Sequence, residues 1–406
     1  MRRGTNLPAV GGFNQAVVLD LIRRAPEGLS RVELADASGL SSQTVTNVCR
    51  RLLEGGLVRE VGRVVAGPGK PRTILDIEPA GGYAIGVHLD PSFVTYVVVD
   101  LEGSVIADSR SRTPTEVRPK DVLVSMQRNI EGLVDSSGIE RSRLLGVGIA
   151  APGPIDREAG IVDDPPLLTG WHRVPLRDAL AERLALPVAL DKDVSAVAVA
   201  EAWSSGVTDA GVLYYGTGIG LGMIIAGEVL RGSTANAGDS GHLRVSDGGP
   251  LCRCGFRGCL GENSSPFTMT RAAARRGLLV APASASDTIG VDEAYSRLIA
   301  LAHDGVPEAL EVVLRVADDV ARGLVLVANL LDVPRMICAG PFWDRLASVG
   351  LERIRSAVAA DPALVAPHPV RVDGTALGAD VGAIGAACLV LDAVYSPRPA
   401  ALLLRP

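Results

Sequence analysis

The sequence predicts an α/β protein in two parts, a winged helix-turn-helix domain over residues 1–78 and a larger, two-lobed α/β body over residues 79–406. Three observations predict this fold class. The N-terminal part carries three short helical patterns, then two strand patterns, and an excess of positive charge. The rest of the chain runs twice through one strand-turn-strand plan. A histidine and three cysteines cluster in the second of these units, which adds a metal site to the prediction.

Length and composition agree with this division. The chain has 406 residues, more than a single hydrophobic core usually supports. It has 47% apolar residues, no uncharged apolar run of ~18 residues and no secretory signal pattern, so we expect a cytoplasmic protein with no membrane partner. Residues 1–75 hold 11 Lys and Arg against 6 Asp and Glu, whereas the remainder has a net charge of −11. The basic end is therefore expected to have its own partner.

The first part predicts helices over residues 14–24, 32–38 and 41–54, the second of them capped by Ser30. Apolar residues occupy one face of the third helix, and Cys49 on that face is expected to fill the core rather than to sense redox state. The opposite face is polar and suited to the edges of bases and to phosphates. The residues predicted to contact DNA from this helix are Ser42, Gln43, Thr44, Thr46, Asn47 and Arg50.

A two-stranded wing is predicted next, over residues 57–65 and 73–77. Its turn carries Lys70 and Arg72, cations that suit a narrow minor groove. The alternative interpretation is a small helical bundle that mediates protein contacts and carries ordinary solvated arginines.

The body predicts two similar hairpins, one over residues 84–106 and one over residues 214–225. Each is followed downstream by an apolar strand that ends in small residues. This duplication predicts facing lobes, residues 79–190 and 191–377, with a C-terminal helix over residues 378–395 that joins the first lobe. The second hairpin turns on a glycine-rich sequence typical of phosphate-binding loops, although such hairpins also occur without phosphate. Its residues are Gly216, Thr217, Gly218 and Gly220.

The metal site is predicted from spacing. Cys252 and Cys254 form a Cys-x-Cys pair, Cys259 follows five residues later, and His242 closes the set. Thiolate and imidazole ligands in all four positions favour a structural Zn²⁺ with no place for a catalytic water. The alternatives are free cysteines in a loop or a disulfide, and a disulfide is disfavoured in a chain without a secretory signal.

Together these motifs resemble the ROK family, whose name joins repressors, open reading frames and sugar kinases. The resemblance runs nearly end to end, and it implies an actin-like fold related to sugar kinases and RNase H, a dimer or dimer of dimers, and a zinc ion near a sugar cleft. It rests on the winged helix, residues 146–156, Gly170-Trp171, residues 174–176, Asp193, residues 216–220, the Gly241-His242 and cysteine signature, and residues 376–380.

The chain departs from the family's kinases in the first phosphate loop. Those kinases read Asp-x-Gly-Gly-Thr where this chain has His88, Leu89, Asp90, Pro91 and Ser92. Here Asp90 repels phosphate, and Pro91 has no N–H to donate. Phosphoryl transfer depends on positioning and charge neutralisation, so we predict no kinase activity. Asp193, at the position of the kinase base, and the Gly216 to Gly220 turn would then be vestigial.

The sugar cleft also differs from the family pattern. Pro166 and Lys192 replace asparagines, Asp239 replaces a glutamate, and Glu262 is displaced by one position from the family's acid. The resemblance implies an effector site made of Lys192, Asp193, Asp239, His242 and Glu262. Two roles stay open for Lys192, attraction of an anionic effector such as a sugar phosphate or an ion pair with Asp191 or Asp193.

Two functions are therefore considered. The favoured one is a DNA-binding transcriptional regulator, a repressor of carbohydrate genes that binds an inverted-repeat operator and a small sugar or sugar-phosphate effector. The alternative is an ATP-dependent sugar kinase with a DNA-binding head, supported by Asp193 and the glycine turn but opposed by His88, Pro91 and Pro166. A regulator that has lost its effector also stays open.

Overall fold

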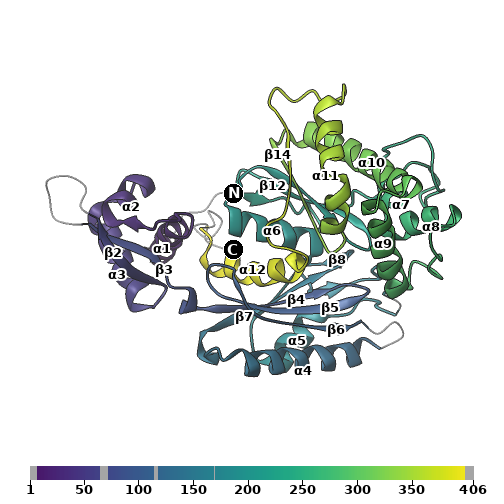
Figure 1. Cartoon of the computed structure of the whole chain (residues 1–406). Coiled ribbons are helices and arrows are strands. Elements are labelled where there is room, and N and C mark those ends of the chain that lie inside the picture. Colours follow the sequence, from purple (N-terminus) through teal and green to yellow (C-terminus); the bar gives the residue numbers. More distant parts are fainter. Residues whose placement is uncertain (1–6, 65–71, 114–117, 169, 398–406) are drawn as a thin grey trace.

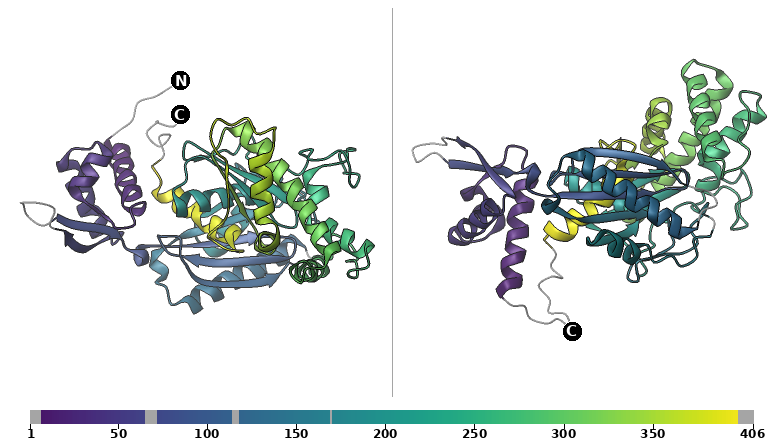
Figure 2. Two further views of the ribbon diagram at one scale, coloured as in Figure 1. Left: turned by 45° about the horizontal axis from the view of Figure 1, so that its top comes forward. Right: turned by 90° about the horizontal axis from the view of Figure 1, so that it is seen from below.

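The computed structural model of this chain describes residues 7–64, 72–113, 118–168 and 170–397 (Figure 1). A small head, formed by the N-terminal residues, lies to one side of a larger body, and the chain passes from one to the other between β3 and β4 (Figures 1 and 2). Within the described ranges, no helix is both long and apolar enough to cross a membrane.

The head is a winged helix-turn-helix, as the sequence predicts. Three helices pack against a three-stranded antiparallel sheet in the order β1-β3-β2. The first helix starts seven residues earlier than predicted, and it continues through Gly11 and Gly12. Pro8 stands near its first turn, where proline is favoured. The elements are α1 Leu7–Arg23, β1 Leu29–Ser30, α2 Arg31–Ser38, α3 Ser42–Glu54, β2 Val58–Val64 and β3 Arg72–Ile77.

Local capping fixes the turn between the second and third helices. Ser30 and Glu33 form a capping box at the start of α2, in which the Ser30 N–H donates to Glu33 Oε2 at 2.8 Å. Gly39 ends α2 with a φ of 68°, a left-handed conformation that glycine adopts without cost. Ser41 then caps α3 by accepting the Thr44 N–H at 3.2 Å. The direction of α3 is therefore set by residues on either side of a short turn.

The body contains two five-stranded sheets of the same plan, which confirms the predicted duplication. The first has the order β10-β7-β4-β5-β6, and the second has the order β15-β14-β11-β12-β13. In each sheet an antiparallel hairpin pairs with two further parallel strands. The first sheet comprises β4 Tyr83–Leu89, β5 Phe93–Val99, β6 Val105–Arg112, β7 Leu144–Ala151 and β10 Val188–Lys192, and the second comprises β11 Ala210–Tyr215, β12 Ile219–Ile225, β13 Glu228–Val229, β14 Arg335–Ala339 and β15 Arg371–Gly374.

Helices cover the outer faces of both sheets, and two more lie between the sheets (Figure 1). The helices between the sheets are α6 Asp193–Ser205 and α12 Val381–Tyr395. The outer helices are α4 Pro119–Ser137 and α5 Leu176–Leu184 on the first lobe, and α7 Leu260–Ser264, α8 Pro266–Arg275, α9 Thr288–His303, α10 Pro307–Leu331 and α11 Trp343–Ala360 on the second lobe. Short pieces at β8 Ile155–Asp156 and β9 Ile161–Val162 form a separate two-stranded ribbon.

Glycines allow the inner helices to lie directly on the strands. A Cβ on Gly148 of β7 would stand 1.7 Å from the Ala386 carbonyl oxygen of α12, and one on Gly222 of β12 would stand 2.5 Å from the Val194 carbonyl oxygen of α6. The two helices also touch each other, since a Cβ on Gly385 would stand 2.2 Å from Ala196 O. Such close backbone contact leaves no room for a side chain between α6 and α12 at this point. Their apolar core is continuous with that of the head.

Candidate functional site

The outer face of α3 presents the polar residues that the sequence predicts for DNA contact. Ser42, Gln43, Thr46, Asn47 and Arg50 are all exposed, while the opposite face of the helix is buried. Arg50 forms only an exposed pair with Glu54 at 3.5 Å, a contact that contributes little and leaves the guanidinium available. The buried face consists of Val45, Val48, Cys49 and Leu52.

Two other predicted head residues have different surroundings. Thr44 is half-buried, and its hydroxyl lies 2.9 Å from the Ser41 hydroxyl, so it takes part in the helix cap. Cys49 is fully buried, and burial raises the pKa of its thiol, which agrees with the expected core position. At the wing, Arg72 is exposed at the start of β3, whereas Lys70 and the turn lie outside the described residues.

A cleft of about 390 Å³ lies between the lobes. It brings together all five residues of the expected effector site, and three of the four residues of the glycine turn. Tyr214, at the end of β11, also lines the cleft, and the sequence analysis did not single it out as a site residue. Tyr214 is the second-last residue of this buried strand and lies two residues before the glycine turn, and this position is the signal that could have found it. The effector-site and turn residues along the cleft are Lys192, Asp193, Asp239, His242, Glu262, Thr217, Gly218 and Gly220.

The turn between β4 and β5 carries Asp90, whose carboxylate contacts Thr217 in the turn between β11 and β12. Asp90 Oδ1 accepts the Ser92 N–H at 2.8 Å, and the Asp90 carbonyl accepts the Thr113 hydroxyl at 2.6 Å. These bonds hold Asp90 in place. Its other carboxylate oxygen accepts the Thr217 hydroxyl at 3.5 Å, across the cleft. The hydroxyl of the glycine turn therefore has a protein carboxylate as its partner.

Asp193 begins α6 in the floor of the cleft, and its Oδ1 lies 2.7 Å from the Val194 nitrogen. Burial raises the pKa of Asp193, and the neighbouring His88 opposes this rise. His88 is only 8% exposed and stands edge-on to the Tyr214 ring, with 6.0 Å between ring centroids. The His88 ring is therefore buried against Tyr214 and does not line the cleft.

Lys192 does not form the ion pair that was one of its two expected roles. Its ammonium group donates to the backbone carbonyls of Asn236 at 3.3 Å and Ala237 at 3.4 Å. Neither Asp191 nor Asp193, the two partners considered, forms an ion pair with it among the described residues; Asp191 instead accepts Arg231 Nε at 2.6 Å and lies 3.4 Å from Arg157 Nε. The reason is geometric, because successive residues of β10 point to opposite faces of the sheet. Asp191 is buried, whereas Lys192 lines the cleft.

The four expected metal ligands converge. The potential ligand atoms of His242, Cys252, Cys254 and Cys259 all lie within 4.8 Å of one another. The Cys254 and Cys259 sulfurs are 3.5 Å apart, and Cys252 Sγ is 3.4 Å from His242 Nδ1. A tetrahedral ion with metal-sulfur bonds of about 2.3 Å requires sulfur-sulfur separations of about 3.8 Å. The cluster therefore fits a metal ion.

The backbone of residues 242–262, here called the cysteine knuckle, explains why these four side chains converge. The Cys252 N–H bonds Phe256 O at 2.8 Å, and the Gly255 N–H bonds Cys252 O at 2.9 Å. Gly258 has a φ of +81°, and a Cβ there would stand 1.7 Å from Ser246 O. Burial and the neighbouring Cys254 thiol raise the pKa of Cys259 to about 12, and a bound cation would offset the cost of ionising it.

The head contacts the body at the far end of α6. Arg23 of α1 donates to the Trp203 carbonyl, and its guanidinium carbon lies 4.0 Å from the centroid of the Trp203 ring. Arg24 donates to Gly206 O at 3.3 Å, and Asp20 pairs with both arginines. Two cations therefore meet the negative end of the α6 dipole. The same helix begins at Asp193 in the cleft.

Comparisons with known proteins cover both parts. Residues 84–393 match the model of the ROK family, and residues 12–64 match that of the MarR family. A putative xylose repressor of Caldicellulosiruptor sp. (strain Rt8B.4) is 26% identical, over 90% of this chain and 92% of the relative. The DNA-binding transcriptional dual regulator NagC of Escherichia coli (strain K12) is 26% identical, over 84% of this chain and 83% of the relative. A crystal structure described as a ROK family transcriptional regulator, a homologue of the E. coli MLC protein, superposes with a TM-score of 0.74 at 23% identity, covering 95% of this chain and 97% of that one.

Proposed function

The chain belongs to the ROK family, and from that premise we propose that it is a DNA-binding transcriptional repressor of carbohydrate-related genes, controlled by a sugar-like effector. The observation that carries the proposal is the exposed polar face of α3, on a basic head attached to a kinase-like body. One relative named as a putative xylose repressor and one named as a DNA-binding transcriptional dual regulator, matched over 92% and 83% of their lengths, support it.

The proposed mode of DNA binding follows from the head. Helix α3 enters the major groove, where Gln43, Asn47 and Arg50 reach base edges, and Ser42, Thr44 and Thr46 contact the backbone. The wing, with Lys70 and Arg72, reaches the adjacent minor groove. A homodimer, or a dimer of dimers, places two such heads on an inverted-repeat operator.

We propose that the body is not a kinase. The first turn has Asp90 and Pro91 where phosphate-binding loops have glycine N–H groups, and the Asp90 carboxylate already bonds Thr217. Asp193 and the turn from Gly216 to Gly220 remain as parts of the scaffold. His242, Cys252, Cys254 and Cys259 hold a structural Zn²⁺, which cross-links the knuckle beside the cleft residues Asp239 and Glu262.

Helix α6 supplies the link between effector and DNA. Its 13 residues span about 20 Å, from Asp193 in the cleft to the arginine contacts of the head. When a ligand closes the cleft, one lobe rotates against the other about the contact between α6 and α12, and Arg23 transmits the movement of α6 to α1. The operator is released because the altered head spacing no longer matches successive major grooves.

Fluorescence anisotropy on operator DNA, selected from a random library with the wild-type protein, tests the proposal. Asn47→Ala is expected to weaken binding by about 1 to 3 kcal/mol, because it removes a base contact. Arg72→Ala is expected to lower the slope of log affinity against log salt by about one, because it removes a phosphate contact. Arg118→Ala, an exposed arginine on the body, is the matched control and should change neither. Equal affinity for all three variants would refute the proposed interface.

A further inference from the structure

The end of the cleft that would hold phosphate in a kinase is lined with carboxylates. Asp90 and Asp193 line the cleft, and together with Asp380 they lie close enough to Tyr214 to act on its hydroxyl. Burial, followed by these three negative charges, raises the pKa of Tyr214 well above its ordinary value. Among the residues that the structure describes, the buried Tyr214 hydroxyl has no hydrogen-bond partner, although its side chain lines the cleft. At this end of the cleft the uncharged Tyr214 hydroxyl is therefore a hydrogen-bond donor surrounded by carboxylates.

Asp90 is fixed in the position from which it repels phosphate. Its backbone bonds Phe93 and Thr113, and its carboxylate bonds the Ser92 N–H, so the side chain cannot turn away without loss of these contacts. The carboxylate also accepts a hydrogen bond from the Thr217 hydroxyl. A phosphate oxygen brought to this turn would lose that donor and face a like charge.

Cations do not compensate for these acids. Four carboxylates line the cleft, those of Asp90, Asp193, Asp239 and Glu262. Two cations, Lys192 and Arg253, also line the cleft, so its acids outnumber its cations by two. The Lys192 ammonium is directed at the carbonyls of Asn236 and Ala237, and Arg253 is exposed. Carboxylates accept hydrogen bonds from sugar hydroxyls, whereas a dianionic phosphate needs convergent donors or cations.

We infer that the cleft accepts an uncharged, unphosphorylated sugar and that Asp90 is the specificity-determining residue that rejects the phosphate ester. The inference rests on the proposed function, since it concerns the same effector cleft, and it decides between the neutral and anionic effectors that the sequence left open.

Isothermal titration of the full-length protein tests this inference with D-glucose, N-acetylglucosamine and D-xylose, each beside its phosphate monoester. At least one free sugar should bind wild-type protein at least a hundredfold more tightly than its ester. Asp90→Asn removes the charge and keeps the size of the side chain, and it should reduce this preference at least tenfold. Asp108→Asn removes a charge from an exposed position on β6 of the same lobe, away from the cleft lining, and should leave the preference unchanged. Asp90→Ser is a second variant that also removes the charge, in case Asp90→Asn does not fold.

An ester that binds wild-type protein as tightly as the free sugar would overturn the inference. An unchanged preference in both Asp90 variants would overturn the role of Asp90. If none of the six compounds bound wild-type protein, the inference would fail together with the effector part of the proposed function. The anisotropy experiment with Asn47→Ala would still decide DNA binding independently.

Discussion

The two halves of the body place equivalent hairpin turns on either side of the cleft, but the turns differ in chemistry. The turn between β4 and β5 carries Asp90 and Pro91, whereas the turn between β11 and β12 keeps Gly216, Thr217 and Gly218. Glycines near the second turn have a packing role, because a Cβ on Gly220 would stand 2.5 Å from Val194 Cγ1 of α6. A glycine motif of this kind can therefore be required for helix packing, independently of any binding of phosphate.

The cysteine knuckle of residues 242–262 belongs to the second half of the body, and its four potential ligands fit a metal ion. Cys259→Ser should abolish zinc content and lower stability by more than about 3 kcal/mol, because a buried ligand is lost and residues 242–262 lose their cross-link. Metal analysis and thermal unfolding measure both effects. Cys49→Ala, a buried cysteine in the head, is the control for zinc content. Full zinc occupancy in Cys259→Ser would exclude this residue as a ligand.

Replacement by alanine of the glycines that contact α6 and α12 should lower stability by similar amounts in both halves of the body. Gly148→Ala and Gly222→Ala place a methyl group against a helix backbone and should each cost about 1 to 3 kcal/mol or more in denaturant unfolding. Gly218→Ala is the matched control, because a Cβ at that position has no neighbour within 4 Å and should change stability by less than about 0.5 kcal/mol. If Gly218→Ala were as destabilising as Gly222→Ala, the packing explanation of the second half would be wrong.

Asp193 is the first residue of α6, and Asp380 directly precedes α12. Replacement of these two aspartates by asparagine should change stability in opposite directions. Burial raises the pKa of Asp193, so the folded protein loses stability as the pH rises from the ordinary aspartate pKa to the raised pKa of the folded state. Asp193→Asn should therefore be more stable than wild type at neutral pH, and this gain should disappear as the pH falls below about 4, the ordinary aspartate value. Thermal unfolding of both proteins from about pH 3 to about pH 8 measures this gain. A gain that grew as the pH fell would reverse the assignment.

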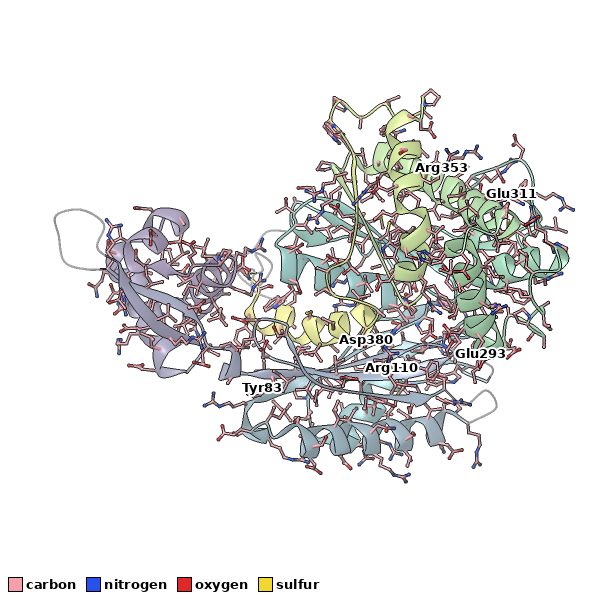
Figure 3. All side chains as sticks on the ribbon, in the orientation of Figure 1. Tyr83, Arg110, Glu293, Glu311, Arg353 and Asp380 are labelled. Atoms are coloured by element: carbon pink, nitrogen blue, oxygen red, sulfur yellow. The ribbon has the colours of Figure 1, made fainter. Side chains whose placement is uncertain are left out.

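Asp380, which precedes α12, instead pairs with Arg110 of β6 (Figure 3). Both side chains are partly exposed, so Asp380→Asn should lower stability by only about 0.2 to 1 kcal/mol at neutral pH. Arg110→Ala should give a similar loss, and the double variant should show that the two effects are not additive. Fully additive losses would mean that the pair does not contribute to stability.

Local patterns explain how much the sequence could predict. Ser30, Gly39 and Ser41 determine the helix-turn-helix from neighbouring residues, and the cysteine spacing determines the knuckle. The duplicated sheets follow from repeated apolar strands and glycines.

Contacts between distant segments were not predictable in this way. The bond from Thr217 to Asp90 joins residues 127 positions apart, and the contact of Arg23 with Trp203 spans 180 positions. The ion pair considered for Lys192 does not form, because neighbouring residues of a strand point to opposite faces of the sheet. Asp191 pairs with Arg231 instead, and Lys192 donates to Asn236 O.

The central claim is that the body does not transfer phosphate from ATP to a sugar, but still binds a sugar and changes its shape when it does. The most direct measurement titrates wild-type protein with the tightest-binding free sugar, with and without MgATP, and analyses the mixture by mass spectrometry. The account predicts the same sugar affinity in both titrations and no phosphate ester. A sugar phosphate formed in proportion to protein and dependent on MgATP would contradict it.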